Sequence, residues 1–290
     1  MNEHHTCLTR RDFVRGTLGA AVGAGTIAGA GASGQQRSLP ASRVTVLRDQ
    51  NALAAGNKVD SVVLKRMLAE TLQTVTGEKS ARNAWLSLVK LSDVVGLVPT
   101  PHLNPTHQEL VDLIREGLLE AGIPRGRVVL AQGGPEKAKS CTALISLPGL
   151  KAHWLTGIGT VLKNYIMYSG SPSSYHDENN VKLGEIWNLP HVKGKTRLII
   201  VDALRPLCDK GPQPDPRYMW NYSGLIAGTD PVAVETVSLG IITRKRQALR
   251  GEPWPISPPP LCVAAAEQRY GLGTSRVHVD QIGWALDPLL

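Results

Sequence analysis

Short apolar runs alternate along this sequence with segments of helical periodicity, and this alternation limits the folds that the chain can adopt. An apolar run at residues 94–98 precedes a segment at 106–122 whose large apolar residues recur on one helical face. The same order returns at 197–202 and 230–242. Strands that alternate with helices predict an α/β fold, with a mainly parallel or mixed sheet and helices on both faces. The length fits one large domain or two lobes around a cleft.

Capping residues indicate where several of the expected helices begin and end. Asp60 is suited to begin a helix that Gly77 ends, and Thr106 and Glu109 have the spacing of a capping box. Pro231 would occupy the first position of another helix, where its missing N–H costs nothing. We also expect helices at 81–89 and 261–270 and strands at 128–130, 143–147 and 277–282.

The N-terminal residues have the composition of an export signal. Arg10 and Arg11 form a twin-arginine pattern, and a Gly/Ala-rich stretch with a small-residue cleavage site follows them. We therefore expect recognition by the twin-arginine translocase and a periplasmic or extracellular protein. The stretch is too short and too rich in glycine to span a bilayer, so no stable membrane span is expected in the mature form. The predicted organisation is a signal peptide at 1–32, a linker and N-terminal segment at 33–57, and an α/β domain at 58–290.

Composition narrows the possible partners. The net charge is +8, and the chain contains a single Phe, so a stacking platform for nucleic-acid bases is not expected. The positive charge fits either a solvated basic surface or an anionic substrate. No Cys-x-x-Cys occurs, which argues against an iron–sulfur cluster and a structural zinc site. Cys141, Cys208 and Cys262 allow one disulfide with a free thiol or three buried thiols, and we favour the buried thiols.

A polar segment follows the expected strand at 143–147. The apolar residues at 158–166 have helical spacing, so we expect the polar side chains between them to lie at a strand end and a helix start near Thr156. Ligands bind at such positions in open α/β folds, and a helix N-terminus with two lysines would hold an anion. The alternative is a capped surface helix with two solvated lysines. The predicted substrate-binding residues are Lys151, Thr156, Gly157, Lys163 and Asn164.

Two histidines and three acidic residues are the other candidates for chemistry. We predict that His153, His176 and Asp202 are catalytic, with a histidine as the general acid or base. His176 is also explained as an exposed loop residue, and Asp202 as a turn residue. Asp230 is explained as a helix cap, although His153, His176, Asp202 and Asp230 together have the side chains for a divalent metal. Glu235 follows on the same helix and either faces the cleft or does not.

Several common catalytic motifs are absent. The sequence contains no G-x-S-x-G nucleophile elbow, no H-E-x-x-H zinc motif, no P-loop and no G-x-G-x-x-G after a strand. The cofactor therefore stays unassigned, with a divalent metal as the candidate that the side chains allow.

Five motifs together resemble the DUF362 family, a family without a settled general activity. They are the Leu-Pro-Gly-Leu-Lys-Ala-His run at 147–153, the Thr-Gly and Lys-Asn pairs at 155–164, the Ile-Ile-Val-Asp-Ala run at 199–203, the Asp-Pro-Val-Ala motif at 228–235 and Tyr-Gly-Leu-Gly at 270–273. The chain departs from the family pattern at Val98–Thr100, where a Lys-Pro-Asn motif is expected, and at Glu235, where an Asp is expected. The added iron–sulfur module of many relatives has no counterpart here.

These observations predict an exported protein that acts on or binds a small anionic ligand in a cleft lined by Lys, His and Asp, with metal assistance as an option. Whether it is an enzyme is left open. The alternative is a non-catalytic periplasmic binding or accessory protein for an anion or a cofactor. A third option is a protein that binds partners through its proline-rich loops at 211–216 and 253–260.

Overall fold

A computed structural model describes residues 6–8, 40–176 and 181–284 of the chain. The strands are β1 (Thr6–Leu8), β2 (Ser42–Asp49), β3 (Val95–Pro99), β4 (Val128–Leu130), β5 (Ala143–Leu147), β6 (Gly149–His153), β7 (Gly157–Ile158), β8 (Thr196–Leu207), β9 (Gly224–Gly228) and β10 (Val277–Trp284). The α-helices are α2 (Ser61–Thr76), α3 (Ala81–Leu88), α4 (Gln108–Ala121), α5 (Pro135–Lys139), α6 (Leu183–Trp187), α7 (Pro231–Arg250) and α8 (Cys262–Gln268). Short 3₁₀ helices lie at Gln50–Ala52 (η1), Ala55–Asn57 (η2), Arg125–Arg127 (η3), Ile166–Ser169 (η4) and Pro172–Tyr175 (η5).

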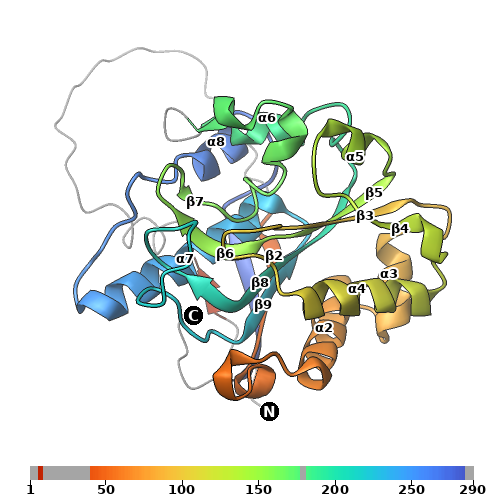
Figure 1. The fold of residues 1–290 in the computed structure, drawn as a ribbon, viewed down its shortest axis with the longest axis horizontal. Helices are drawn as coiled ribbons and strands as arrows, with labels where there is room; N and C mark the ends of the chain where they lie inside the picture. Colours follow the sequence, from red (N-terminus) through yellow and green to blue (C-terminus); the bar gives the residue numbers. More distant parts are fainter. Residues whose placement is uncertain (1–5, 9–39, 177–180, 285–290) are drawn as a thin grey trace.

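The strands form one mixed, mostly parallel sheet with helices around it (Figure 1). The strand order is β1-β10-β2-β9-β8-β5-β3-β4, and β6 pairs with the second half of β8 and with β7. β4, β3, β5 and β8 run parallel, whereas β9 is antiparallel to both β8 and β2. The predicted α/β fold is confirmed.

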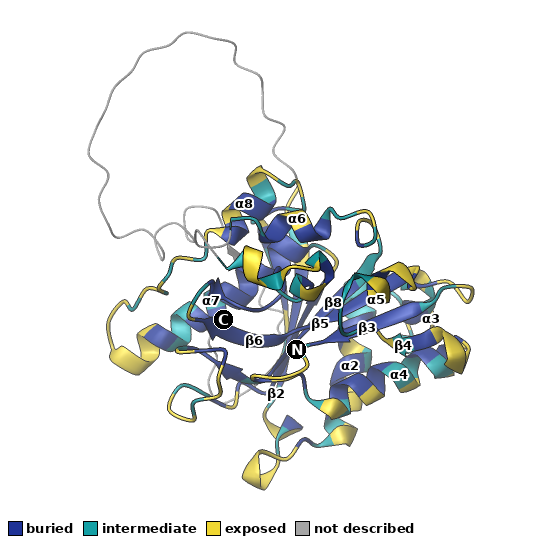
Figure 2. Ribbon diagram, turned by 45° about the horizontal axis from the view of Figure 1, so that its top comes forward, coloured by how far each residue is buried: buried dark blue, intermediate teal, exposed yellow. Residues whose placement is uncertain are grey.

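Alternating residues of the central strands build a separate core on each face of the sheet. In β8, Ile199 and Val201 pack on the side of α5 to α8, whereas Leu198, Ile200 and Leu204 pack on the side of α2 to α4. Figure 2 shows the buried sheet between helices whose outer faces are exposed. Side chains of β8 alternate between the faces, so Asp202 is directed toward the α2–α4 side.

Many of the predicted elements are confirmed with their caps. Asp60 caps α2 by accepting from Val62 N and Val63 N, and Gly77 ends the helix in a left-handed conformation. Asp230 caps α7, whose first residue is Pro231. Cys141, Cys208 and Cys262 are free, buried thiols, as predicted. None of the helices in the described part of the chain has the length and apolar character that a membrane-spanning helix needs.

Two local predictions at helix starts are wrong. Residues 157–165 form β7 and a series of turns that leads into η4, instead of an α-helix, because residues 157 and 158 pair with β6. Thr106 and Glu109 do not form a capping box, since α4 begins one residue later with His107 at the N-cap and no side-chain cap. The hydroxyl group of Thr106 instead donates to Leu147 O of β5.

The sheet also contains segments that lie outside the predicted α/β domain at 58–290. β2 lies within the predicted linker at 33–57 and pairs with β9 and β10 in the middle of the sheet. β1 lies within the predicted signal peptide and pairs antiparallel with β10. The rest of residues 1–39 is outside the described part of the chain, so the predicted signal peptide stays a prediction.

Candidate functional site

β6 carries two of the predicted site residues on a strand instead of in a loop. Its apolar residues Leu150 and Ala152 join the core on the α5–α8 side, so Lys151 and His153 alternate to the other side. Both are almost completely buried, at 5% and 7% exposed. Ionisable groups are rarely buried to this extent without a partner of opposite charge.

Lys151 donates from Nζ to the backbone carbonyl groups of Leu103, at 2.7 Å, and Asn104, at 3.3 Å. These carbonyl groups belong to the loop that joins β3 to α4. Burial, together with the charge of Lys163, lowers the pKa of Lys151 to about 7. Lys151 therefore holds the loop in place and loses its charge easily.

His153 is held in one tautomer. Its Nδ1 accepts a hydrogen bond from Leu155 N at 3.2 Å, so the neutral ring carries its proton on Nε2. Burial, together with the charges of Lys163, His176 and Lys151, lowers the pKa of His153 to about 3. The ring is therefore neutral at physiological pH and offers an N–H donor.

Lys163 and His176 come from the turns and 3₁₀ helices after β7. Burial lowers the pKa of Lys163 to about 8, and burial and the charge of Lys163 lower the pKa of His176. The ring centroids of His153 and His176 are 5.8 Å apart. His176 Nδ1 donates to Pro172 O at 2.8 Å, which leaves its Nε2 as an acceptor in the neutral ring.

Lys151, His153, Lys163 and His176 thus form a cationic cluster. Besides burial, the charges that lower the pKa values of these residues come from other residues of the same cluster. Within the described residues, no acidic side chain forms an ion pair with any of the four, and Lys163 Nζ has no hydrogen-bond partner. Asp177 and Glu178, which follow His176 in the sequence, lie outside those residues. A cluster of this kind can hold an anion.

Three further predicted residues make internal contacts beside the cluster. Asn164 Nδ2 donates to Val98 O and Ser146 Oγ and so joins β3 to β5. Thr156 Oγ1 donates to Ile158 O. Gly157 has a φ of +72°, and a Cβ there would lie 2.5 Å from Pro258 O, so the glycine permits a close approach by the proline-rich loop.

Asp202 lies in the middle of β8, not at its end, because the strand continues through its pairing with β6 and β9. Its Oδ2 accepts from both the backbone N and Nδ1 of His107, each at 2.7 Å, and its Oδ1 accepts from Leu204 N. Burial by itself lowers the pKa of His107, but the hydrogen bond and charge of Asp202 outweigh burial, and the pKa is raised. Asp202 therefore orients His107 rather than a histidine of the cationic cluster.

Asp230 is occupied by contacts within the fold. Its carboxylate accepts from Val232 N and Ala233 N of α7, from Ser42 Oγ and from Thr274 N. The structure thus does not bring Asp202 and Asp230 together with His153 and His176. In the described ranges, no group of three or more His, Cys, Asp or Glu side chains has an arrangement that could hold a metal ion.

Glu235 lies beneath the turn that leads to Lys163. It is fully buried in α7, and its Oε2 accepts from Val161 N at 2.7 Å. Burial raises the pKa of Glu235 to about 8, so the carboxyl group is mostly protonated at neutral pH. The residue supports the turn and leaves the cluster without a counter-charge.

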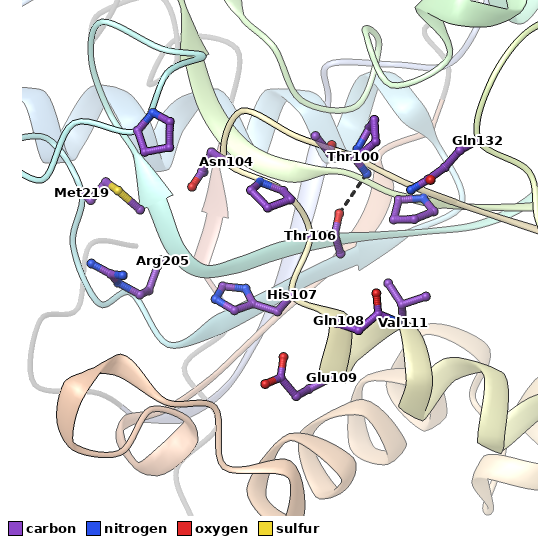
Figure 3. A pocket seen from close by; sticks show the side chains of 14 residues that line it. Thr100, Asn104, Thr106, His107, Gln108, Glu109, Val111, Gln132, Arg205 and Met219 are labelled. Atoms are coloured by element: carbon purple, nitrogen blue, oxygen red, sulfur yellow. Dashed lines mark hydrogen bonds between the residues drawn. The ribbon is translucent and has the colours of Figure 1, made fainter.

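His107 and Arg205 were not predicted as site residues. Both line a pocket of about 490 Å³ between β3, α4 and β8, shown in Figure 3. His107 is the N-cap of α4 at the end of the loop that follows β3, which is the kind of position that predicted the other candidates. Interpreting residues 106–109 as a capping box concealed it, and Arg205 shows no signal besides its spacing of three residues from Asp202.

The fold and the site define an α/β protein with a partly buried cationic cluster beside the second half of β8. The sequence matches the family model DUF362, described as a domain of unknown function, over residues 96–240, and the chain belongs to this family. The matched range extends from β3 into α7 and includes the cationic cluster and the pocket at His107. No curated protein and no solved structure matches the chain.

Proposed function

We propose that this protein binds a small anionic ligand at the cationic cluster of Lys151, His153, Lys163 and His176. The observation that carries the proposal is that these cationic or proton-donating groups are gathered without an acidic partner in the described part of the chain. Placing charge there costs free energy, as the lowered pKa values of both lysines show. An anion with several oxygen atoms would offset that cost and accept the hydrogen bonds of Lys163 Nζ and His153 Nε2.

In a reaction, His153 and His176 would be the groups that move protons, since one presents a donor and the other an acceptor. The alternative is a non-catalytic binding or accessory protein. It would use the same site as an enzyme but would release the anion chemically unchanged. We propose that the anion binds without a metal ion, because the four candidate metal-binding side chains, those of His153, His176, Asp202 and Asp230, do not lie together. We also propose export by the twin-arginine route, which Arg10 and Arg11 support.

The proposal is tested by calorimetric titration with inorganic phosphate, sulfate and citrate. Lys163→Met keeps most of the unbranched side chain but removes its charged end. We expect an affinity roughly ten- to a hundredfold lower, as for the loss of one charge-assisted hydrogen bond. Lys139→Met is the matched control, because Lys139 is exposed on α5. Equal affinity of wild type and Lys163→Met for every anion would contradict the proposal.

The pH dependence of the same titration provides a second measurement. The lysines have pKa values of about 7 and 8 when the site is empty, and a bound anion stabilises their charged forms. Binding should therefore take up protons near pH 8, and the affinity should fall as the pH rises through this range. Proton uptake is measured by repeating the titration in buffers with different ionisation enthalpies.

A further inference from the structure

The pocket that His107 and Arg205 line is separate from the cationic cluster. Its lining contains none of the four residues of the cluster, and the loop between β3 and α4 forms part of its wall. Lys151 contacts that loop through the carbonyl groups of Leu103 and Asn104. The pocket and the cluster thus have different lining residues and share the support of this loop.

Asp202 fixes His107 so that one ring nitrogen is left for the pocket. His107 Nδ1 is used by Asp202 Oδ2, and the same oxygen also accepts from the backbone N of His107. The side chain of Asp202 is 2% exposed and that of His107 is 24% exposed, so the imidazole lies between a buried carboxylate and the pocket. Its Nε2 is the nitrogen that can contact a ligand.

Arg205 lies at the same end of the pocket as His107, and Figure 3 shows the two side chains beside each other. Its Nε is buried and has no hydrogen-bond partner among the described residues. Leaving a buried guanidinium N–H without an acceptor costs free energy. A planar carboxylate can accept two parallel hydrogen bonds from a guanidinium, one from Nε and one from an Nη atom. The other charged group that lines the pocket is Glu109, whose carboxylate lies below His107 in the same view.

The remaining wall favours an organic ligand over an inorganic ion. Four prolines, Val111 and Met219 provide apolar surface, whereas Thr100, Asn104, Thr106 and Gln132 provide polar groups. Ligand sites commonly combine apolar walls with a few placed polar groups in this way.

We propose that this pocket is a second binding site, which takes a small organic carboxylate held by Arg205 and by Nε2 of His107. The imidazole donates from Nε2 when it is protonated, with Asp202 balancing its charge from behind. The negative charge of Glu109 disfavours a ligand with a second negative group on the side that faces Glu109. None of the residues that would hold the carboxylate belongs to the cationic cluster.

The test is an NMR titration of the His107 ring with acetate, succinate and benzoate, alongside calorimetry. We expect at least one carboxylate to shift the His107 resonances and to raise the pKa of this histidine. Arg205→Met should weaken that binding roughly ten- to a hundredfold. Arg82→Met is the matched control, because Arg82 is exposed on α3. Lys163→Met should leave the binding unchanged.

Two outcomes would overturn the inference. One is that no carboxylate shifts the ring of His107. The other is that binding is lost in Lys163→Met but kept in Arg205→Met, which would place the carboxylate at the cationic cluster. A failure of Lys163→Met to weaken phosphate binding contradicts only the proposed function, so the two proposals are distinguished.

Discussion

Glu235 is an ionisable residue in a fully buried position. A carboxyl group in water has an ordinary pKa of 4.5, but burial in α7 raises that of Glu235 to about 8. Oε2 accepts from Val161 N, whereas Oε1 has no partner among the described residues. The folded state therefore prefers the protonated form, and folding becomes linked to pH.

We predict that Glu235→Gln removes this linkage. The raised pKa of Glu235 adds to the stability of the folded wild type. This contribution is complete below pH 4.5 and is lost as the pH rises toward about 8. The variant should therefore gain stability relative to wild type over this range, by about 2–5 kcal/mol in total. Urea unfolding at a series of pH values measures the difference, with exposed Glu252→Gln as control. A difference that does not change with pH would show that Glu235 is ionised in the folded protein.

At the scale of elements, β6 decides which residues form the cationic cluster. Pairing with β8 and β7 makes residues 149–153 a strand, and alternation then places Lys151 and His153 on one side and Leu150 and Ala152 on the other. A helix at 158–166 has the right apolar spacing, but the pairing of β7 with β6 competes with it. Spacing alone does not distinguish these outcomes, because short apolar segments fit both.

Two glycines with the same backbone angle provide a test of how closely β7 is packed. Gly157 and Gly194 both have a φ of +72°, but a Cβ at Gly194 meets nothing within 4 Å, whereas one at Gly157 meets Pro258 O. Gly194→Ala should cost about 1 kcal/mol of backbone strain. Gly157→Ala should cost about 2 kcal/mol more, since the proline-rich loop must move. Urea unfolding of both variants measures this, and equal losses would mean that the loop yields easily.

On the scale of the whole molecule, Asp230 connects parts that lie far apart in the sequence. It caps α7 and also accepts from Ser42 at the start of β2 and from Thr274 ahead of β10. Asp60 forms the same two cap bonds in α2. Comparing Asp60 with Asp230 therefore separates the contribution of a helix cap to stability from that of the additional hydrogen bonds to Ser42 and Thr274.

We expect Asp60→Ala to lower the free energy of unfolding by about 1 kcal/mol, as for the loss of a helix cap. Asp230→Ala should lower it by about 2–4 kcal/mol, since the bonds to Ser42 and Thr274 are lost as well. Thermal and urea unfolding measure both losses. If the two losses are equal, the links from Asp230 to β2 and β10 contribute nothing to stability.

The sequence by itself determined the α/β class, both ends of α2, the start of α7, the buried thiols and the candidate residues Lys151, His153, Lys163 and His176. These features depend on local periodicity, on capping residues and on residue type, and each of them is set by residues close together in the sequence. The pairing of Asp202 with His107, the separate role of Asp230 and the pocket at Arg205 were decided by the tertiary structure. They depend on which strands are neighbours and which face a residue occupies. They also depend on contacts between segments far apart in the sequence, such as the hydrogen bond between His107 and Asp202.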